Sequence, residues 1–157
     1  LFRSGLSIMR RVHRIFLDTS VIFAAVLSET GGARKLFRLG EAGVLQLVVG
    51  SNVLRECEDV IRRKVPASLP KLAYLLELGM VEITPHSPDT FIDQAAAIVV
   101  YKPDAYVLAE AIAVGPDWFI THDKTHFLSV DLDSNLAFRI GTPGDLIQSL
   151  EDEFTQS

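Results

Sequence analysis

The sequence is poor in cysteine and has no long hydrophobic run. Its one cysteine, Cys57, excludes an internal disulfide and the paired-cysteine spacing of a structural zinc site. The longest apolar runs, VIFAAVL and AAAIVV, are far shorter than the roughly 18 residues that a membrane span needs. We therefore expect a protein of the reducing cytoplasm that has no membrane segment and in which Cys57 is part of the core.

The sequence also has no excess of basic residues over acidic ones. With 15 Lys and Arg against 20 Asp and Glu, the formal net charge is −5, which argues against broad, nonspecific binding to duplex nucleic acid. Neither a GxGxxG motif nor a Walker-type loop is present, which disfavours the common nucleotide-cofactor sites. Arg34, Lys35 and Arg38 form a local basic cluster, although such clusters usually lie on solvated helix faces.

The hydrophobic content of 48% in 157 residues is enough for one compact domain. Residues 1–11 are interpreted as a flexible leader, and residues 12–153 as a single domain. The pattern predicts strands over residues 14–17, 45–49, 80–84, 118–121 and 137–140. It predicts helices over residues 21–27, 33–42, 53–64, 69–78, 90–100, 105–114 and 142–153. This alternation predicts an α/β fold, a three-layer α/β/α sandwich around a mainly parallel five-stranded sheet.

Four acidic residues map to one edge of this sheet. Asp18 ends the first strand, and Asp123 follows the fourth. Asp104 opens the helix before that strand, and Glu56 lies near the start of the helix after the second. Taken singly, each is an ordinary cap, turn or first-turn residue. Gathered without bases, however, carboxylates repel one another, and this repulsion must be relieved by protonation or by a bound cation. Carboxylate oxygens suit Mg²⁺ or Mn²⁺, and such an ion supports phosphodiester hydrolysis, so we expect Asp18 both to cap its helix and to bind metal.

The helix over residues 53–64 leaves one choice open. Glu56 and Glu58 fall on opposite borders of its predicted buried stripe and are equally close to the centre of that stripe, whereas Asp59 faces solvent. The stripe consists of Val53, Leu54, Cys57, Val60 and Ile61. Periodicity alone therefore cannot choose between the two glutamates.

Aromatic and histidine residues near the fourth strand allow other interpretations. His122 and His126 are four residues apart, a spacing that binds zinc on a helix, but a third nitrogen or sulfur ligand is not evident and the segment starts as a turn. We favour packing for His126 and a position near the substrate for His122. Trp118 and Phe119 open the strand, so core packing is favoured over base stacking.

Four segments resemble, in their order and spacing, the PIN-domain family, including the VapC-type toxin ribonucleases. They are FLDTSVIFAAVL, GGARKLFRLGEAGVLQLVVGSNVLRECEDVIRRK, PDAYVLAEAIAVGPDWFITHDKTHFL and AFRIGTPGDLI. The resemblance covers residues 15–147. It implies that the family's catalytic and metal-binding acids are Asp18, Glu56, Asp104 and Asp123. It also implies accessory hydroxyl roles for Ser20 and Thr121, with Ser20 standing where many members carry asparagine.

The resemblance implies an endoribonuclease that depends on Mg²⁺ or Mn²⁺ and cuts single-stranded or structured RNA. It also implies a homodimer and, for a VapC-type toxin, an antitoxin protein as partner. RNA is taken from the resemblance, because the acids alone would serve DNA equally. Arg34, Lys35, Arg38 and Lys124 are the candidate RNA-binding residues.

Two other functions compete with this expectation. A PIN scaffold with weak catalysis would use the same fold for RNA binding or assembly, although the presence of all four acids favours activity. A dehalogenase-type phosphatase also has an aspartate at the end of its first strand. It needs a second acid two residues later, and that position is Ser20.

Overall fold

The computed structural model describes residues 11–85, 89–99, 101–123, 127 and 136–156. Its centre is a five-stranded sheet in the order β3-β2-β1-β4-β5, in which every neighbouring pair is parallel. The strands are β1 (His13–Leu17), β2 (Leu45–Gly50), β3 (Glu82–Thr84), β4 (Trp118–Ile120) and β5 (Arg139–Gly141). The predicted five-stranded parallel sheet is confirmed.

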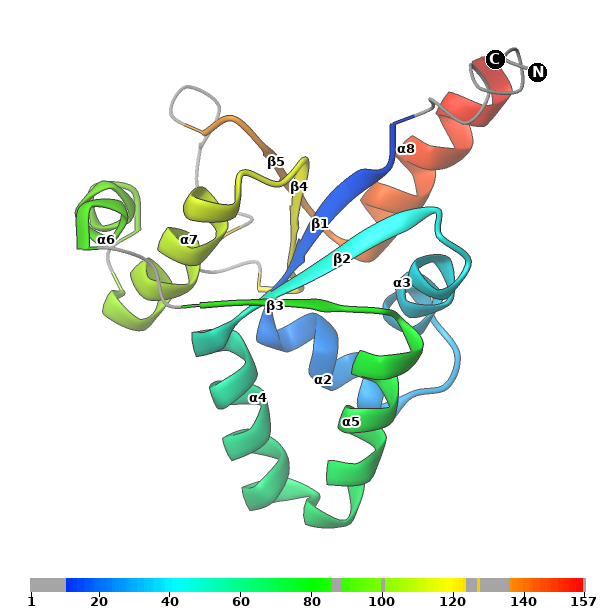
Figure 1. The fold of residues 1–157 in the computed structure, drawn as a ribbon, viewed down its shortest axis with the longest axis horizontal. Helices are drawn as coiled ribbons and strands as arrows, with labels where there is room; N and C mark the ends of the chain where they lie inside the picture. The colour runs from blue at the N-terminus through cyan, green and yellow to red at the C-terminus, as the bar shows by residue number, and fades with distance from the viewer. Residues whose placement is uncertain (1–10, 86–88, 100, 124–126, 128–135, 157) are drawn as a thin grey trace.

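Helices cover both faces of the sheet. The helices are α2 (Thr19–Leu27), α3 (Gly32–Glu41), α4 (Ser51–Lys64), α5 (Leu69–Leu78), α6 (Asp89–Ala96), α7 (Lys102–Val114) and α8 (Pro143–Gln156), with a 3-10 turn, η1 (Pro66–Ser68), between α4 and α5. Figure 1 shows α6 and α7 on one side of the sheet and α3 and α8 on the other, while α4 and α5 extend away from it. The predicted α/β/α layering is thus confirmed.

The core is built on the two central strands. Ile15, Phe16 and Leu17 of β1 are fully buried, as are Leu47 and Val48 of β2. A parallel strand covered on both faces needs such a continuous apolar run, because both sets of alternating side chains are buried. Each large side chain buried here stabilises the fold by about 1.5–3 kcal/mol.

Aromatic packing extends this core to the fourth strand. The rings of Phe16 and Phe119 stack with their centroids 5.5 Å apart, and Phe127 lies 4.8 Å from Phe119. Trp118 is 6% exposed and Cys57 is fully buried. The expected core roles of Trp118, Phe119 and Cys57 are confirmed.

Helices α7 and α4 are among those that begin earlier than the sequence pattern predicts. Helix α7 begins at Lys102, with Pro103 in its first turn, because proline loses no helical hydrogen bond there. Asp104 therefore lies within the first turn of α7. Helix α4 begins at Ser51, directly after β2, and the buried carboxylate of Glu110 accepts the Asn52 N–H at 3.0 and 3.1 Å. A residue from α7 thus supplies the acceptor that a local cap would otherwise provide.

Residues 1–10 of the expected leader lie outside the described residues. Within the described ranges, none of the helices has the length and apolar character that crossing a bilayer requires.

Candidate active site

The carboxyl ends of β1, β2 and β4 meet at the edge of the sheet that the sequence singled out. Asp18 follows β1, and its backbone N–H donates to the Ile120 carbonyl oxygen at 3.0 Å, which ties the end of β1 to the end of β4. Thr121 follows β4, and α4 follows β2 without an intervening loop. Residues far apart in the chain are thereby brought to one place, as the parallel topology requires.

Asp18 is a buried carboxylate held by two hydroxyls. Asp18 is 7% exposed, and its Oδ2 accepts hydrogen bonds from Thr121 Oγ1 at 2.8 Å and Ser20 Oγ at 2.9 Å. It occupies the N-cap position of α2, but its side chain makes no capping hydrogen bond. The expectation that Asp18 caps the helix is therefore wrong, because its carboxylate is turned towards the hydroxyls instead.

The same two hydroxyls anchor the turn that follows β4. Ser20 Oγ accepts the His122 N–H at 3.0 Å, and Thr121 Oγ1 accepts the Asp123 N–H at 2.9 Å. Each hydroxyl thus accepts from the backbone while it donates to Asp18. This arrangement sets the orientation of the Asp18 carboxylate and the position of the half-buried Asp123 together.

Glu56 reaches the site from α4. Its Oε1 accepts a hydrogen bond from Thr19 Oγ1 at 2.5 Å, and Thr19 is the residue that follows Asp18. The charge of Glu56 raises the pKa of Asp18, whereas Glu58 has no such effect on it. Of the two glutamates that periodicity left equivalent, Glu56 is therefore the one on the Asp18 side. The hydrogen bond between Thr19 and Glu56 was not predicted, because nothing in the spacing of the two residues links them.

The electrostatics of the site disfavour a second negative charge. Burial raises the pKa of Asp18, the hydrogen bonds from Thr121 and Ser20 lower it, and Glu56 raises it further. Burial also raises the pKa of Cys57 to about 12, with additional contributions from Glu56 and Asp18. Cys57 is therefore a protonated core thiol at neutral pH and not a nucleophile. In the described part of the chain, neither Asp18 nor Glu56 forms an ion pair.

The other two acids lie at the same edge but not in one tight cluster. Asp104 is half-buried in the first turn of α7, and Asp123 follows Thr121 by two residues. Among the described residues, no three His, Cys, Asp or Glu side chains lie close enough to form a metal site as they stand. The two carboxylates of Asp18 and Glu56 and the hydroxyls that hydrogen-bond to them nevertheless offer oxygen atoms as ligands. Oxygen ligands fit Mg²⁺ or Mn²⁺. Metal binding by the four acids stays a prediction.

Among the basic residues expected to bind substrate, one is buried and two are exposed on α3. Arg34 is only 8% exposed, and its Nε donates to the Ala25 carbonyl oxygen at 3.0 Å, which joins α3 to α2. Lys35 and Arg38 are exposed on α3, which packs on α2, α5 and α8. The structure thus gives Arg34 a structural contact, because a buried guanidinium must satisfy its donors. Lys124 lies outside the described residues, as does His126, while His122 is exposed.

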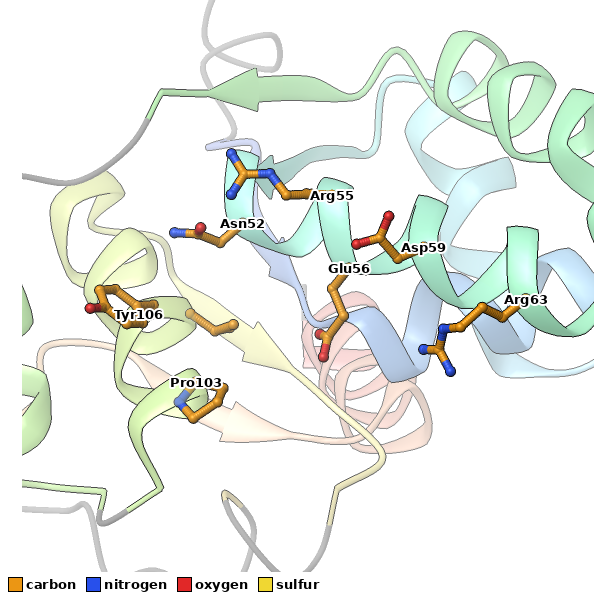
Figure 2. Close-up of a pocket in the computed structure, with 8 residues that line it drawn as sticks. Asn52, Arg55, Glu56, Asp59, Arg63, Pro103 and Tyr106 are labelled. Carbon is orange, nitrogen blue, oxygen red and sulfur yellow. The ribbon is translucent and has the colours of Figure 1, made fainter.

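A groove between α4 and α7 was not predicted. Its volume is about 270 Å³, and Glu56 forms part of its wall. Figure 2 shows Asn52, Arg55 and Arg63 on α4 and Pro103 and Tyr106 on α7 around this space. The sequence carried no signal for the groove, because it forms only when the two helices pack together.

Glu110, which is 1% exposed, was also missed. Its position within the apolar run LAEAIA was the available signal, since a lone acid there must find a buried donor.

Two of three comparisons relate this chain to known proteins. The family model described as "PIN domain" matches residues 14–125. A search of curated proteins finds no significant match. Among solved structures, VapBC2 from Rickettsia felis, bound to a DNA fragment from its promoter, is similar with a TM-score of 0.64 and 17% identity, covering 82% of this chain and 98% of that one. The Mycobacterium tuberculosis toxin VapC20, which cleaves the sarcin–ricin loop, is similar with a TM-score of 0.50 and 18% identity, covering 71% and 91%.

Proposed function

The chain belongs to the PIN-domain family, and from this premise we propose that it is an endoribonuclease that depends on Mg²⁺ or Mn²⁺. Its substrate is the phosphodiester backbone of single-stranded or structured RNA. The observation that carries the proposal is the pair Asp18 and Glu56, which share a site and form no ion pair with any described residue. Repulsion between two such carboxylates is relieved by protonation or by a cation that binds between or beside them.

In this proposal Asp18 and Glu56 hold the ion, and Asp104 and Asp123 complete the acidic set around it. A bound divalent ion neutralises phosphate charge and lowers the pKa of water, which is the chemistry that the hydrolysis needs. Ser20 and Thr121 keep the Asp18 carboxylate in one orientation, and Thr19 does the same for Glu56. Hydrogen bonds of this kind typically change metal affinity or activity by about 10–100-fold when they are removed.

We further propose that the protein is the toxin of a toxin–antitoxin pair, acting in the cytoplasm as a homodimer with an antitoxin as its partner. The likeness to a VapBC2 complex and to the toxin VapC20 supports this at the level of the fold. An antitoxin segment that placed an arginine beside Asp18 and Glu56 would supply the cation that these acids lack among the described residues. Co-expression with a small adjacent gene product, followed by size-exclusion chromatography, tests this part.

A PIN scaffold with weak catalysis is the second candidate. The observation that favours it is the spread of the acids, since no three of them converge among the described residues. This candidate predicts RNA binding without metal-dependent cleavage.

The test is the cleavage of a labelled, mixed-sequence single-stranded RNA with Mn²⁺ or with EDTA. Asp18→Asn is the inactive variant. Glu151→Gln is the matched control, because Glu151 is an exposed acid of α8 that does not line the groove beside Glu56. We expect cleavage only with Mn²⁺, its loss in Asp18→Asn and its retention in Glu151→Gln. Equal cleavage by the wild type and Asp18→Asn would contradict the nuclease site, and binding without cleavage would support the scaffold.

A further inference from the structure

The groove between α4 and α7 opens beside the candidate active site. Its α7 wall is mainly apolar, formed by Pro103, the half-buried Tyr106 and the buried Val107, and its α4 wall is polar. Figure 2 shows Asn52 near Tyr106 at one end, with Arg55 on the Asn52 side, while Arg63 lies at the opposite end beyond Glu56. Glu56 belongs both to this groove and to the Asp18 site, so an occupant of the groove lies next to the reacting centre.

The groove combines the three features by which proteins hold an unpaired nucleotide. A tyrosine ring offers a flat face on which a base can stack, and every base has such a face. An asparagine amide can donate to and accept from the edge of a base. An arginine can neutralise a backbone phosphate. Two of these features come from α4 and one from α7, at a spacing that only the packing of the two helices creates.

The size of the groove limits what it can hold. A volume of about 270 Å³ lies just below the range of roughly 300–1,000 Å³ that is typical of small-ligand sites, which suits one nucleoside. Asn52 and Arg63 are eleven residues apart on α4, or about 16 Å along the helix axis, so a phosphate can lie beyond the base. A base inside a duplex cannot use the tyrosine face, because its own faces are covered by its neighbours in the stack.

We propose that this groove holds an unpaired nucleotide of the substrate beside the scissile phosphate. The base stacks on Tyr106, Asn52 contacts its edge, and Arg63 contacts the backbone phosphate. This inference rests on the proposed ribonuclease function and deepens it, because it makes Tyr106 a residue that selects single-stranded over paired RNA. Asn52 then contributes a preference for the identity of the base.

Two substitutions at Tyr106 separate stacking from packing. Tyr106→Phe keeps the ring, whereas Tyr106→Leu keeps an apolar side chain but removes the flat face. Tyr74→Leu is the matched control, because Tyr74 is a 59% exposed tyrosine on α5, away from the groove. Binding of labelled single-stranded RNA is measured by fluorescence anisotropy in the Asp18→Asn background, where cleavage does not interfere. KM and kcat are measured separately in the active protein with Mn²⁺.

We expect Tyr106→Leu to weaken single-strand binding and to raise KM by about 5- to 100-fold, with kcat and melting temperature little changed. Tyr106→Phe and Tyr74→Leu should stay within about twofold of the parent, because neither removes the stacking ring from the groove. Arg63→Gln should weaken binding of every sequence alike, and Asn52→Ala should change the relative affinities for different bases. The same RNA annealed to its complement should bind weakly to all of these proteins.

The outcomes distinguish this inference from the proposed function. If Tyr106→Leu binds and cleaves like the wild type, the groove does not hold the base, while metal-dependent cleavage that Asp18→Asn lacks still supports the nuclease. If binding depends on Tyr106 but no RNA is cut, the result supports base binding in the groove and contradicts the nuclease proposal. If the wild type does not bind single-stranded RNA, or binds its duplex equally well, the inference is overturned.

Discussion

At the amino end of the central sheet, acidic side chains have basic partners. Asp117, just before β4, accepts hydrogen bonds from Arg11 and, at 2.8 Å, from the backbone N–H of Arg14. Glu82 of β3 pairs with the Arg14 guanidinium at 2.8 Å, and Glu153 of α8 lies 3.1 Å from His13 Nε2. These contacts join β1 to β3, to β4 and to the last helix, so their role is to hold the strands and α8 together.

At the carboxyl end, the acids are held by hydroxyls instead. Asp18 accepts from Ser20 and Thr121, Glu56 accepts from Thr19, and neither acid has an ion pair among the described residues. Hydroxyl donors orient a carboxylate without neutralising it. The buried charge of Asp18 therefore lowers the stability of the free protein. Burial and the charge of Glu56 both raise the pKa of Asp18 for the same reason.

Under the proposed function, this difference separates residues that stabilise the sheet from residues that act at the candidate site. Exposed ion pairs contribute only about 0–1 kcal/mol each, but they cost the protein little. A buried acid without a counter-charge is unfavourable, and its perturbed pKa is typical of a functional site, such as one that binds a cation. The comparison predicts that acids at the two ends will respond in opposite ways to the same substitution.

The largest effect should come from neutralising one acid at each end. Asp18→Asn should lower cleavage by more than about 100-fold while leaving the metal-free protein equally or more stable, because it removes a buried charge. Asp117→Asn should retain cleavage but lose about 1–3 kcal/mol of unfolding free energy, because it weakens the acceptor of the Arg14 N–H and the Arg11 contact. Urea unfolding in EDTA and the cleavage assay measure both. A large loss of stability in Asp18→Asn would make Asp18 a structural residue instead.

Metal should stabilise the protein only through the carboxyl end. A ligand that binds the folded state alone adds about 2.7 kcal/mol at a hundredfold excess over its Kd. Mn²⁺ should therefore raise the melting temperature of the wild type and of Asp117→Asn, and leave that of Asp18→Asn nearly unchanged. Thermal scans with millimolar Mn²⁺ and with EDTA measure this shift. Equal shifts in all three proteins would mean that the ion binds elsewhere.

Two glutamates of α4 sharpen the comparison further. Glu56→Gln should lower metal affinity and cleavage by about 10–100-fold, because Glu56 shares the site with Asp18. Glu58→Gln should have a mild effect, since Glu58 contributes to the pKa of Cys57 but not to that of Asp18. Metal titration calorimetry and initial cleavage rates compare the two variants. The reverse order would show that the helix acid of the site is Glu58.

The fold was predictable from the sequence because local signals and topology agree. The central strands are continuous apolar runs, and helices separate them, so a covered parallel sheet was the consistent solution. The parallel order then placed Asp18, Thr121 and α4 at one edge without any knowledge of distances. Boundaries were less certain where a proline or a distant residue sets them. Helix α7 begins at Lys102, earlier than expected, because Pro103 is tolerated in its first turn. Glu110 allows α4 to begin at Ser51.

The details of the site were less predictable because they depend on partners far away in the chain. Charge patterning singled out Arg34, but its guanidinium is buried against the Ala25 carbonyl oxygen. Periodicity could not choose between Glu56 and Glu58. The family resemblance singled out Glu56, and its contact with Thr19, on another helix, appears only in the structure. Tyr106 lies beside Asn52 only after α4 and α7 pack together. Each of these contacts is tertiary, and no local pattern encodes it.

The smallest effect should appear in the pH dependence of the metal-free protein. Burial, with a smaller contribution from Glu56, raises the pKa of Asp18 above its ordinary value of 3.8. The folded state therefore keeps this proton to a higher pH than the unfolded state does, and stability falls as pH rises from about 3.8 through the raised pKa.

Asp18→Asn lacks this titration. Its advantage in melting temperature over the wild type should therefore grow across that pH interval and then become constant. Scans in EDTA between pH 4 and about 8 measure the difference between the two proteins, in which the titration of the other acids largely cancels. A difference that does not change with pH would mean that Asp18 is already neutralised in the free protein, and the contrast between the two ends of the sheet would then lose its electrostatic basis.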